Sequence, residues 1–162
     1  MATNLHGNIS ESFKLGRGCR QGDPISGYIF ILCIEILLLQ LKNNTNIHPY
    51  KTKKQNSHLV EGYADDITLY LHYSNNYENN LNNLYQVVTT LSAYSDISGL
   101  NVNIGKTKLS SFGKNLKLLD LAREAGIQWC TNFTLLGIKY DCTLSKIDEN
   151  YDDVLESIKK SP

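Results

Sequence analysis

The stretch Leu59–Leu71, which reads LVEGYADDITLYL, decides the fold of this chain. Two short apolar runs, Leu59–Ala64 and Ile67–Leu71, flank the adjacent residues Asp65 and Asp66. In the second run apolar and polar residues alternate, which is typical of a strand with one buried face. We therefore predict two strands joined by a tight turn at the aspartates, because at such a turn consecutive side chains need not face opposite ways.

Two carboxylates at a hairpin tip form a candidate Mg²⁺ site, since this cation prefers carboxylate and phosphate oxygens. An unpaired carboxylate between apolar strands is costly to desolvate, so Asp65 and Asp66 need a reason to be there. A turn selected for its backbone chemistry alone is an equally good reason. The hairpin by itself therefore does not decide between a metal site and a simple turn.

Helical patterns lie on both sides of the predicted hairpin. Upstream, Ser26 is a candidate N-cap of a helix over Ser26–Lys42, whose apolar side chains point in nearly all directions and indicate a buried helix. Its most hydrophobic part, Tyr28–Leu41, is too short for a membrane span. Downstream, Asn76–Ser95 carries an apolar stripe, and this second helix is predicted to end near Ser98-Gly99.

Shorter elements complete one compact unit without an internal repeat or a linker. We predict strands over Ile9–Leu15, Lys106–Phe112 and Phe133–Ile138, a polar loop over His48–Ser57, and helices over Asn115–Ala125 and Glu149–Lys160. The fold class is therefore α+β, with an antiparallel sheet that is centred on the hairpin and backed by the two longer helices.

Composition is that of an ordinary globular domain and shows no excess of basic residues. Of 162 residues, 16 are basic and 16 are acidic. Since a nucleic-acid-binding surface is expected to be basic, this balance predicts only weak nucleic-acid binding by the chain alone. The four cysteines are scattered and indicate reduced thiols in an intracellular protein. The N-terminus lacks the features of a signal peptide.

Four motifs follow one another along the chain: the glycine-rich turn Gly18–Ser26, the YADD hairpin Tyr63–Asp66, the segment Ser98–Asn103 followed by Lys106–Lys108, and the strand Phe133–Ile138. Together they resemble the reverse transcriptases of non-LTR (LINE-type) retrotransposons. They occur in the family's order with family-like gaps, between Ile9 and Tyr151. The resemblance implies a polymerase palm in which Phe133–Ile138 helps to hold the primer end, although Leu135, Leu136 and Ile138 are core residues first.

The resemblance implies RNA-directed DNA synthesis by two-metal nucleotidyl transfer. The partners would be an RNA template, a DNA primer and deoxynucleoside triphosphates, and the cofactor would be Mg²⁺. No membrane is implied, and access to chromosomal DNA is compatible with a nuclear location. Viral RNA-dependent RNA polymerases are a more distant alternative, because Tyr63 and Ala64 precede the aspartates where that class has a glycine.

Catalytic roles follow from the resemblance, residue by residue. Asp65 would be a ligand of the catalytic metals, Asp66 would lie beside it as a second acidic group, and Tyr63 would lie near the primer–template. Lys106 would stand near the leaving pyrophosphate, where a cation can stabilise developing charge or donate a proton. The plainer explanation of Lys106 is an ordinary solvated lysine before a strand.

The glycine-rich turn would contribute to nucleotide and template binding. By resemblance, Gln21 and Gly22 would line the pocket of the incoming nucleotide, and Arg20 would contact template or phosphate. Arg20 is also explained as a surface cation, and Gly22 as a backbone conformation that other residues avoid. Gly27 stands where the family usually has proline, so the helix start is predicted to be looser, by about 1 kcal/mol.

One family element is missing from the sequence: a strand with a further metal-binding aspartate. Asp23 is not expected to replace that aspartate, because it lies in the turn before the helix. The fingers are also missing, and Tyr151–Lys160 at most begins a thumb. Residues 1–162 are thus expected to be a partial reverse transcriptase domain with an incomplete metal site and no polymerase activity of its own. The alternative is an inactive or domesticated retroelement remnant that acts as a binding module.

Overall fold

The computed structural model describes residues 4–5, 8–9, 11, 18, 22–112 and 118–160. The helices are α1 (Ser26–Asn43), α2 (Tyr77–Ser98), α3 (Leu118–Glu124) and α4 (Ile147–Lys160). The strands are β1 (Asn4–Leu5), β2 (Asn8–Ile9), β3 (Tyr50–Lys51), β4 (Ser57–His58), β5 (Val60–Tyr63), β6 (Asp66–Leu69), β7 (Lys108–Leu109), β8 (Gln128–Trp129), β9 (Asn132–Leu135) and β10 (Ile138–Asp141). The predicted α+β class is therefore confirmed.

The described strands pair in five two-stranded sheets, which are antiparallel except for the parallel pair β7–β8. Backbone contacts connect two of the antiparallel pairs. A bridge joins Pro49 to Leu71, and the Tyr50 amide donates to the Tyr70 carbonyl oxygen at 2.9 Å. The segment 48–51 thus borders the end of β6, and the predicted polar loop over His48–Ser57 instead contains the β3–β4 hairpin.

The β5–β6 hairpin lies on the two long helices, as predicted. The main core cluster combines Leu37 and Leu41 of α1, Val60 of β5, and Val87 and Tyr94 of α2. Hairpin residues Ile67 and Leu69 pack against this cluster. A second cluster around Leu84, Leu121 and Ile127 joins α2 to α3. One face of the hairpin is therefore held by helices, and the opposite face, called the open face below, exposes Glu61, Tyr63 and Asp66 to solvent.

The predicted end of α2 near Ser98-Gly99 is confirmed, and local contacts explain both ends of the helix. The Asn76 side chain accepts a hydrogen bond from the Asn79 amide at 3.3 Å at the start of the helix. Gly99 ends it with φ +76°, a left-handed conformation that glycine adopts without steric cost, and its amide donates to the Ser95 carbonyl oxygen at 2.8 Å. These two residues fix where the helix begins and ends.

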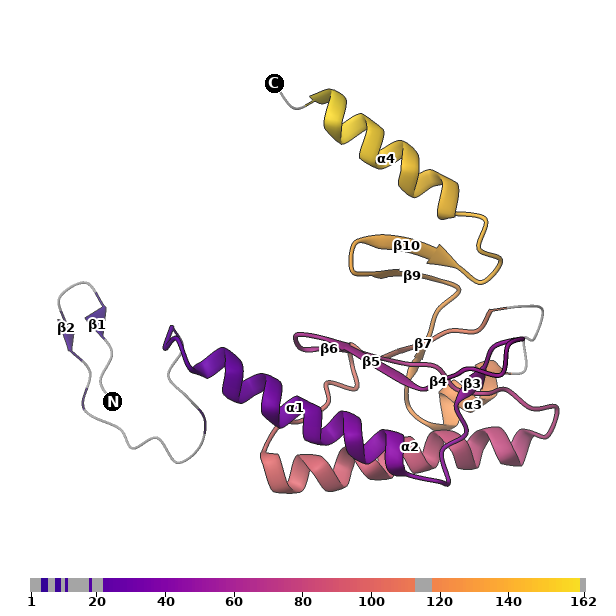
Figure 1. The fold of residues 1–162 in the computed structure, drawn as a ribbon, viewed down its shortest axis with the longest axis horizontal. Coiled ribbons are helices and arrows are strands. Elements are labelled where there is room, and N and C mark those ends of the chain that lie inside the picture. Colours follow the sequence, from indigo (N-terminus) through magenta and orange to yellow (C-terminus); the bar gives the residue numbers. More distant parts are fainter. Residues whose placement is uncertain are drawn as a thin grey trace.

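The prediction that α1 is buried all round is wrong. Leu37 and Leu41 are buried, but Tyr28, Ile31 and Leu32 are 71%, 63% and 66% exposed. The reason is that the helix contacts α2 and β5 and nothing described covers its remaining surface. Figure 1 shows the N-terminal half of α1 extending past the hairpin. The apolar face of this half is therefore open to solvent.

The start and the length of α1 also differ from prediction. Its N-cap is Ile25, not Ser26, whose hydroxyl donates to the Asp23 carbonyl oxygen at 2.7 Å. Gly27 is accordingly the second helical residue. Because α1 has 18 residues, the argument that it is too short for a membrane span fails. It is the one helix of the described residues that is long and apolar enough to cross a membrane by length and composition, a test that core helices of soluble proteins also pass.

The expected single strand Phe133–Ile138 is instead the β9–β10 hairpin. Leu136 and Gly137 form its two-residue loop with φ +49° and +83°, the signs that a type I′ turn requires. Leucine rarely adopts this conformation, so the apolar run hid the turn. The hairpin pairs Phe133 with Tyr140, whose rings stack with centroids 5.4 Å apart.

The remaining predictions are confirmed in part. The expected helix over Glu149–Lys160 corresponds to α4, which lies against β10 on the side of the hairpins away from α1 and α2 (Figure 1). The strand over Lys106–Phe112 is confirmed only as β7. Most of the predicted strand Ile9–Leu15 and the start of the predicted helix Asn115–Ala125 lie outside the described residues.

Candidate functional site

The β5–β6 hairpin positions the predicted metal site at its tip. Tyr63 pairs with Asp66, so these two residues close the turn and their side chains share one face of the hairpin. Val60 pairs with Leu69 on the opposite face, which packs on the helices. Asp65 and Asp66 are both exposed, and Tyr63 is 68% exposed. The hairpin therefore presents an aromatic ring and two carboxylates to solvent.

The turn itself is formed by Ala64 and Asp65, one residue earlier than predicted. Asp66 is the first residue of β6 rather than part of the loop. Ala64 has φ +52°, a left-handed conformation in which its Cβ is crowded. A two-residue hairpin loop requires a positive φ at its first residue, so the geometry of the turn accounts for this conformation. The two carboxylates thus leave the backbone from a loop and from a strand.

A close approach to α1 supports the hairpin from below. A Cβ atom added at Gly62 would lie 3.4 Å from Leu38 Cδ1, so the backbone of β5 rests almost directly on this leucine. Neither Gly62 nor Leu38 was among the site residues predicted from the sequence. A glycine inside a strand pattern is the signal that could have indicated this approach.

A side-chain hydrogen bond lies on the open face of the hairpin. The Tyr70 hydroxyl donates a hydrogen bond to Glu61 Oε2 at 3.2 Å. Burial, followed by the charge of Glu61, raises the pKa of Tyr70. This bond fixes two side chains on the same face as Tyr63, at the end of the hairpin away from the aspartates.

The remaining predicted site residues lie apart from the hairpin or outside the described part of the chain. Arg20 and Gln21 are among the residues that the structure does not describe. Gly22 is exposed with φ +88°, which supports its explanation as a backbone requirement. Lys106 is exposed in a turn where its amide donates to the Asn103 carbonyl oxygen at 3.0 Å. Within the described residues, no hydrogen bond or ion pair joins Lys106 to the aspartates.

The donor set at the tip fits a hard divalent cation that takes its other ligands from water or phosphate. Mg²⁺ is commonly bound through one or two carboxylates together with substrate phosphates. Asp65 and Asp66 supply two such carboxylates. In the part of the chain that the structure describes, no cluster of three or more His, Cys, Asp or Glu side chains could hold a metal ion.

The chain matches a model of a known protein family. Residues 2–140 match the family model described as reverse transcriptase (RNA-dependent DNA polymerase). This range includes the glycine-rich turn, both long helices, the β5–β6 hairpin and nearly all of β10. It also contains every predicted site residue, whereas α4 lies beyond it.

Proposed function

The chain belongs to the reverse transcriptase (RNA-dependent DNA polymerase) family, and on that premise we propose that the tip of its β5–β6 hairpin is part of the polymerase metal site. Its family function is RNA-directed DNA synthesis, which in intact enzymes requires a nucleic-acid template and primer. Within this family we place the chain, again as a proposal, in the non-LTR (LINE-type) group, because of the YADD sequence and the four motifs in order.

The observation that carries the proposal is the position of Asp65 and Asp66. They are adjacent, exposed and held at the tip of a hairpin whose other face is fixed to α1 and α2. A rigid support of this kind holds catalytic groups more precisely than a free loop does. The left-handed conformation of Ala64 is what a two-residue hairpin loop requires, so the proposal rests on the supported position of the two carboxylates and not on this conformation.

The reaction joins the 3′ oxygen of the primer to the α-phosphorus of a deoxynucleoside triphosphate and releases pyrophosphate. Bound by Asp65 and Asp66, Mg²⁺ would supply positive charge to the phosphate oxygens. Tyr63 shares the face of Asp66 and would contact the primer–template through its exposed ring. Arg20, Gln21 and Gly22 for the nucleotide, and Lys106 for pyrophosphate, remain predictions from the family motifs.

Mn²⁺ binding to the isotopically labelled chain tests the proposal. Paramagnetic broadening should be strongest at the amides of Asp65 and Asp66 and should weaken in the Asp65→Asn variant. Asp96→Asn is a matched control, because Asp96 is an exposed acidic residue of α2. Broadening that is unchanged by the double variant Asp65→Ala and Asp66→Ala would contradict the metal site and favour a binding module without catalysis.

Primer extension tests the activity of the 162-residue chain. We expect no extension, because the described residues offer only two carboxylates at the hairpin tip and no cluster of three or more potential metal-binding side chains. Robust extension by the purified chain, abolished by Asp65→Asn, would show instead that these residues complete an active site.

A further inference from the structure

Strand β5 has an open edge. Among the described strands it pairs only with β6. The Tyr70 amide donates to the Leu59 carbonyl oxygen at 2.7 Å, and the two-residue turn is closed by Tyr63 and Asp66. Because hydrogen-bonded pairs alternate along an antiparallel ladder, the N–H and C=O groups of Val60 and Gly62 point outward, away from β6. An exposed edge of this kind is a template for pairing with another strand.

Two depressions lie along this edge, between it and α1. The larger, of about 410 Å³, is lined by the segment 57–61 together with Lys42, Ile47 and Pro49. The smaller, of about 140 Å³, is lined by Gly62 and Ala64 on one side and by α1 on the other, through Phe30, Ile31, Ile34, Glu35 and Leu38. The larger depression is lined by Val60 and the smaller by Gly62, so the two depressions lie two residues apart along β5.

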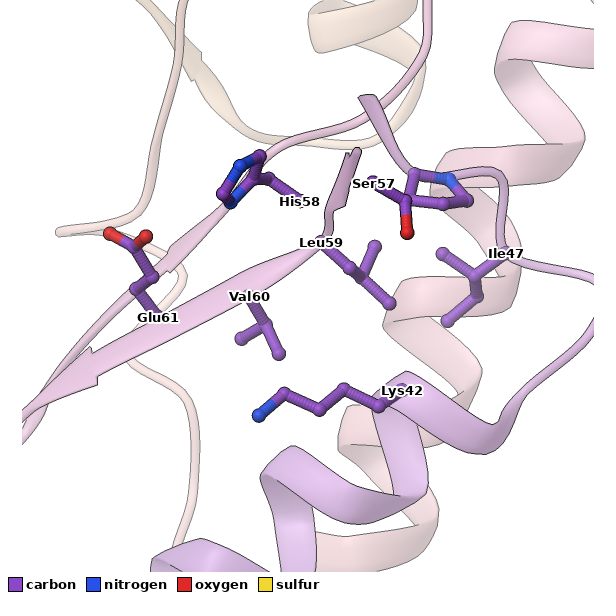
Figure 2. Close-up of a pocket in the computed structure, with 8 residues that line it drawn as sticks. Lys42, Ile47, Ser57, His58, Leu59, Val60 and Glu61 are labelled. Atoms are coloured by element: carbon purple, nitrogen blue, oxygen red, sulfur yellow. The ribbon is translucent and has the colours of Figure 1, made fainter. Parts of the chain in front are cut away.

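Charge distinguishes the larger depression. Lys42 extends from the end of α1 toward β5 beneath Val60, whereas the carboxylate of Glu61 points away from it (Figure 2). Glu61 is hydrogen-bonded to Tyr70 on the open face of the hairpin. The ammonium group is therefore the charge presented toward the edge in this depression, above a floor of the buried Ile47 and Val60. The smaller depression is mostly apolar.

We propose that an extended peptide segment of another protein adds to the outer edge of β5. Its main chain would pair with the outward groups of Val60 and Gly62, as in recognition by strand addition. An acidic side chain would contact Lys42. An apolar side chain two residues away would enter the smaller depression, because alternate residues of a strand share a face about 7 Å apart. This inference goes beyond the polymerase function and does not rest on it.

Amide hydrogen exchange of the full 162-residue chain tests the proposal with two capped threonine-rich peptides. In one, glutamate stands two residues before isoleucine, and in the other the order is reversed, so that both strand directions are covered. The expected result is slower exchange at the amides of Val60 and Gly62. The amides of Glu61 and Tyr63 already pair with β6 and serve as internal controls. A third peptide, with glutamate next to isoleucine, should not bind.

A charge reversal tests the predicted contact with Lys42. Lys42→Glu should weaken binding of the glutamate peptide by roughly two- to fivefold. It should strengthen binding of a peptide in which lysine replaces the glutamate. Lys54→Glu is the matched control, since Lys54 is an exposed lysine that lines neither depression.

Two outcomes would overturn the proposal. The first is unchanged exchange at Val60 and Gly62 with either peptide at millimolar concentration. The second is protection of these amides without peptide, rising with protein concentration together with a dimer in sedimentation, because the edge would then be occupied by a second copy of the chain.

Discussion

The hydroxyl of Tyr94 in α2 donates a hydrogen bond of 2.7 Å to the main-chain carbonyl oxygen of Cys33 in α1. Tyr94 is only 6% exposed, and its ring belongs to the core cluster beneath the hairpin. Burial raises the pKa of its hydroxyl, so the group remains a donor at neutral pH. The bond joins the two helices that carry β5 and β6, and it therefore contributes to the position of Asp65 and Asp66.

Replacing Tyr94 by phenylalanine tests this link between the helices. Tyr94→Phe keeps the ring and removes the donor, so it should lower the free energy of unfolding by about 0.5–1.5 kcal/mol. Urea denaturation measures the change. Tyr85→Phe is the matched control, because Tyr85 is a 64% exposed tyrosine of the same helix. Equal effects of the two substitutions would show that the hydrogen bond contributes nothing.

Asn83 is predicted to be the most sensitive polar residue of α2. It is 2% exposed, its Oδ1 accepts from the His48 amide at 2.8 Å, and its Nδ2 donates to the His48 carbonyl oxygen at 3.0 Å. Asn83→Ala leaves both main-chain groups of His48 without this partner, which should cost about 1–3 kcal/mol. The exposed neighbour Asn82 provides the control Asn82→Ala. Thermal unfolding curves that coincide for the two variants would contradict this role.

Local signals made α2 and the β5–β6 hairpin predictable from the sequence. Asn76 and Gly99 mark the helix ends by their own side-chain and backbone chemistry. The alternation of apolar and polar residues from Ile67 onward indicates a strand with one buried face, whatever packs on that face. The β9–β10 hairpin was missed because Leu136 adopts a backbone conformation that its residue type disfavours. The exposure of α1 could not be predicted, because periodicity records apolar positions and not whether another element covers them.

The candidate site, like the fold, was predictable where its residues are neighbours in sequence. Asp65, Asp66 and Tyr63 are neighbours in sequence, so any tight turn brings them together. Residues that meet only through the tertiary fold were not predicted, as the contact between Gly62 and Leu38 shows. The position of Lys106 relative to the hairpin depends on the long connection through α2, which no local pattern determines.

Gly62→Val should destabilise the protein by displacing Leu38. An added Cβ already lies 3.4 Å from Leu38 Cδ1, so the further methyl groups force the leucine or the hairpin to move, at a cost of about 1–3 kcal/mol. Gly27→Ala is the opposite control, since a Cβ there meets nothing within 4 Å and α1 should gain about 0.5–1 kcal/mol. Urea denaturation of both variants checks the signs. A neutral Gly62→Val would mean that the hairpin does not rest tightly on α1.

Asp141 should make the junction between β10 and α4 sensitive to acid. The Thr143 hydroxyl and the Lys146 amide donate hydrogen bonds to its carboxylate, and these bonds lower its pKa well below the usual range. The stabilisation is therefore complete above the unfolded-state pKa, about 3.9, and is lost as the pH falls through the folded-state value.

Amide exchange at Thr143 and Lys146 measures this effect. Asp141→Asn should speed exchange at pH 7, and the difference from the unsubstituted chain should shrink at about pH 2, because below about 3.9 the unfolded-state carboxylate binds a proton and the stabilisation decreases. Asp152→Asn, at an exposed position of α4, is the control and should change neither amide. A difference between the chains that is the same at both pH values would contradict the role of the carboxylate charge.

The tip carboxylates should contribute to metal binding without contributing to the fold. Asp65 and Asp66 are exposed, and no side-chain hydrogen bond or ion pair of theirs occurs within the described residues. The double variant Asp65→Ala and Asp66→Ala should therefore change the free energy of unfolding by less than about 0.5 kcal/mol, as is usual for surface substitutions. It should still abolish localised Mn²⁺ broadening at the hairpin, whereas Asp96→Ala should leave both properties unchanged. If the free energy of unfolding of the double variant fell by more than about 1 kcal/mol, the aspartates would stabilise the turn itself. Loss of Mn²⁺ binding would then no longer distinguish a metal site from a damaged hairpin.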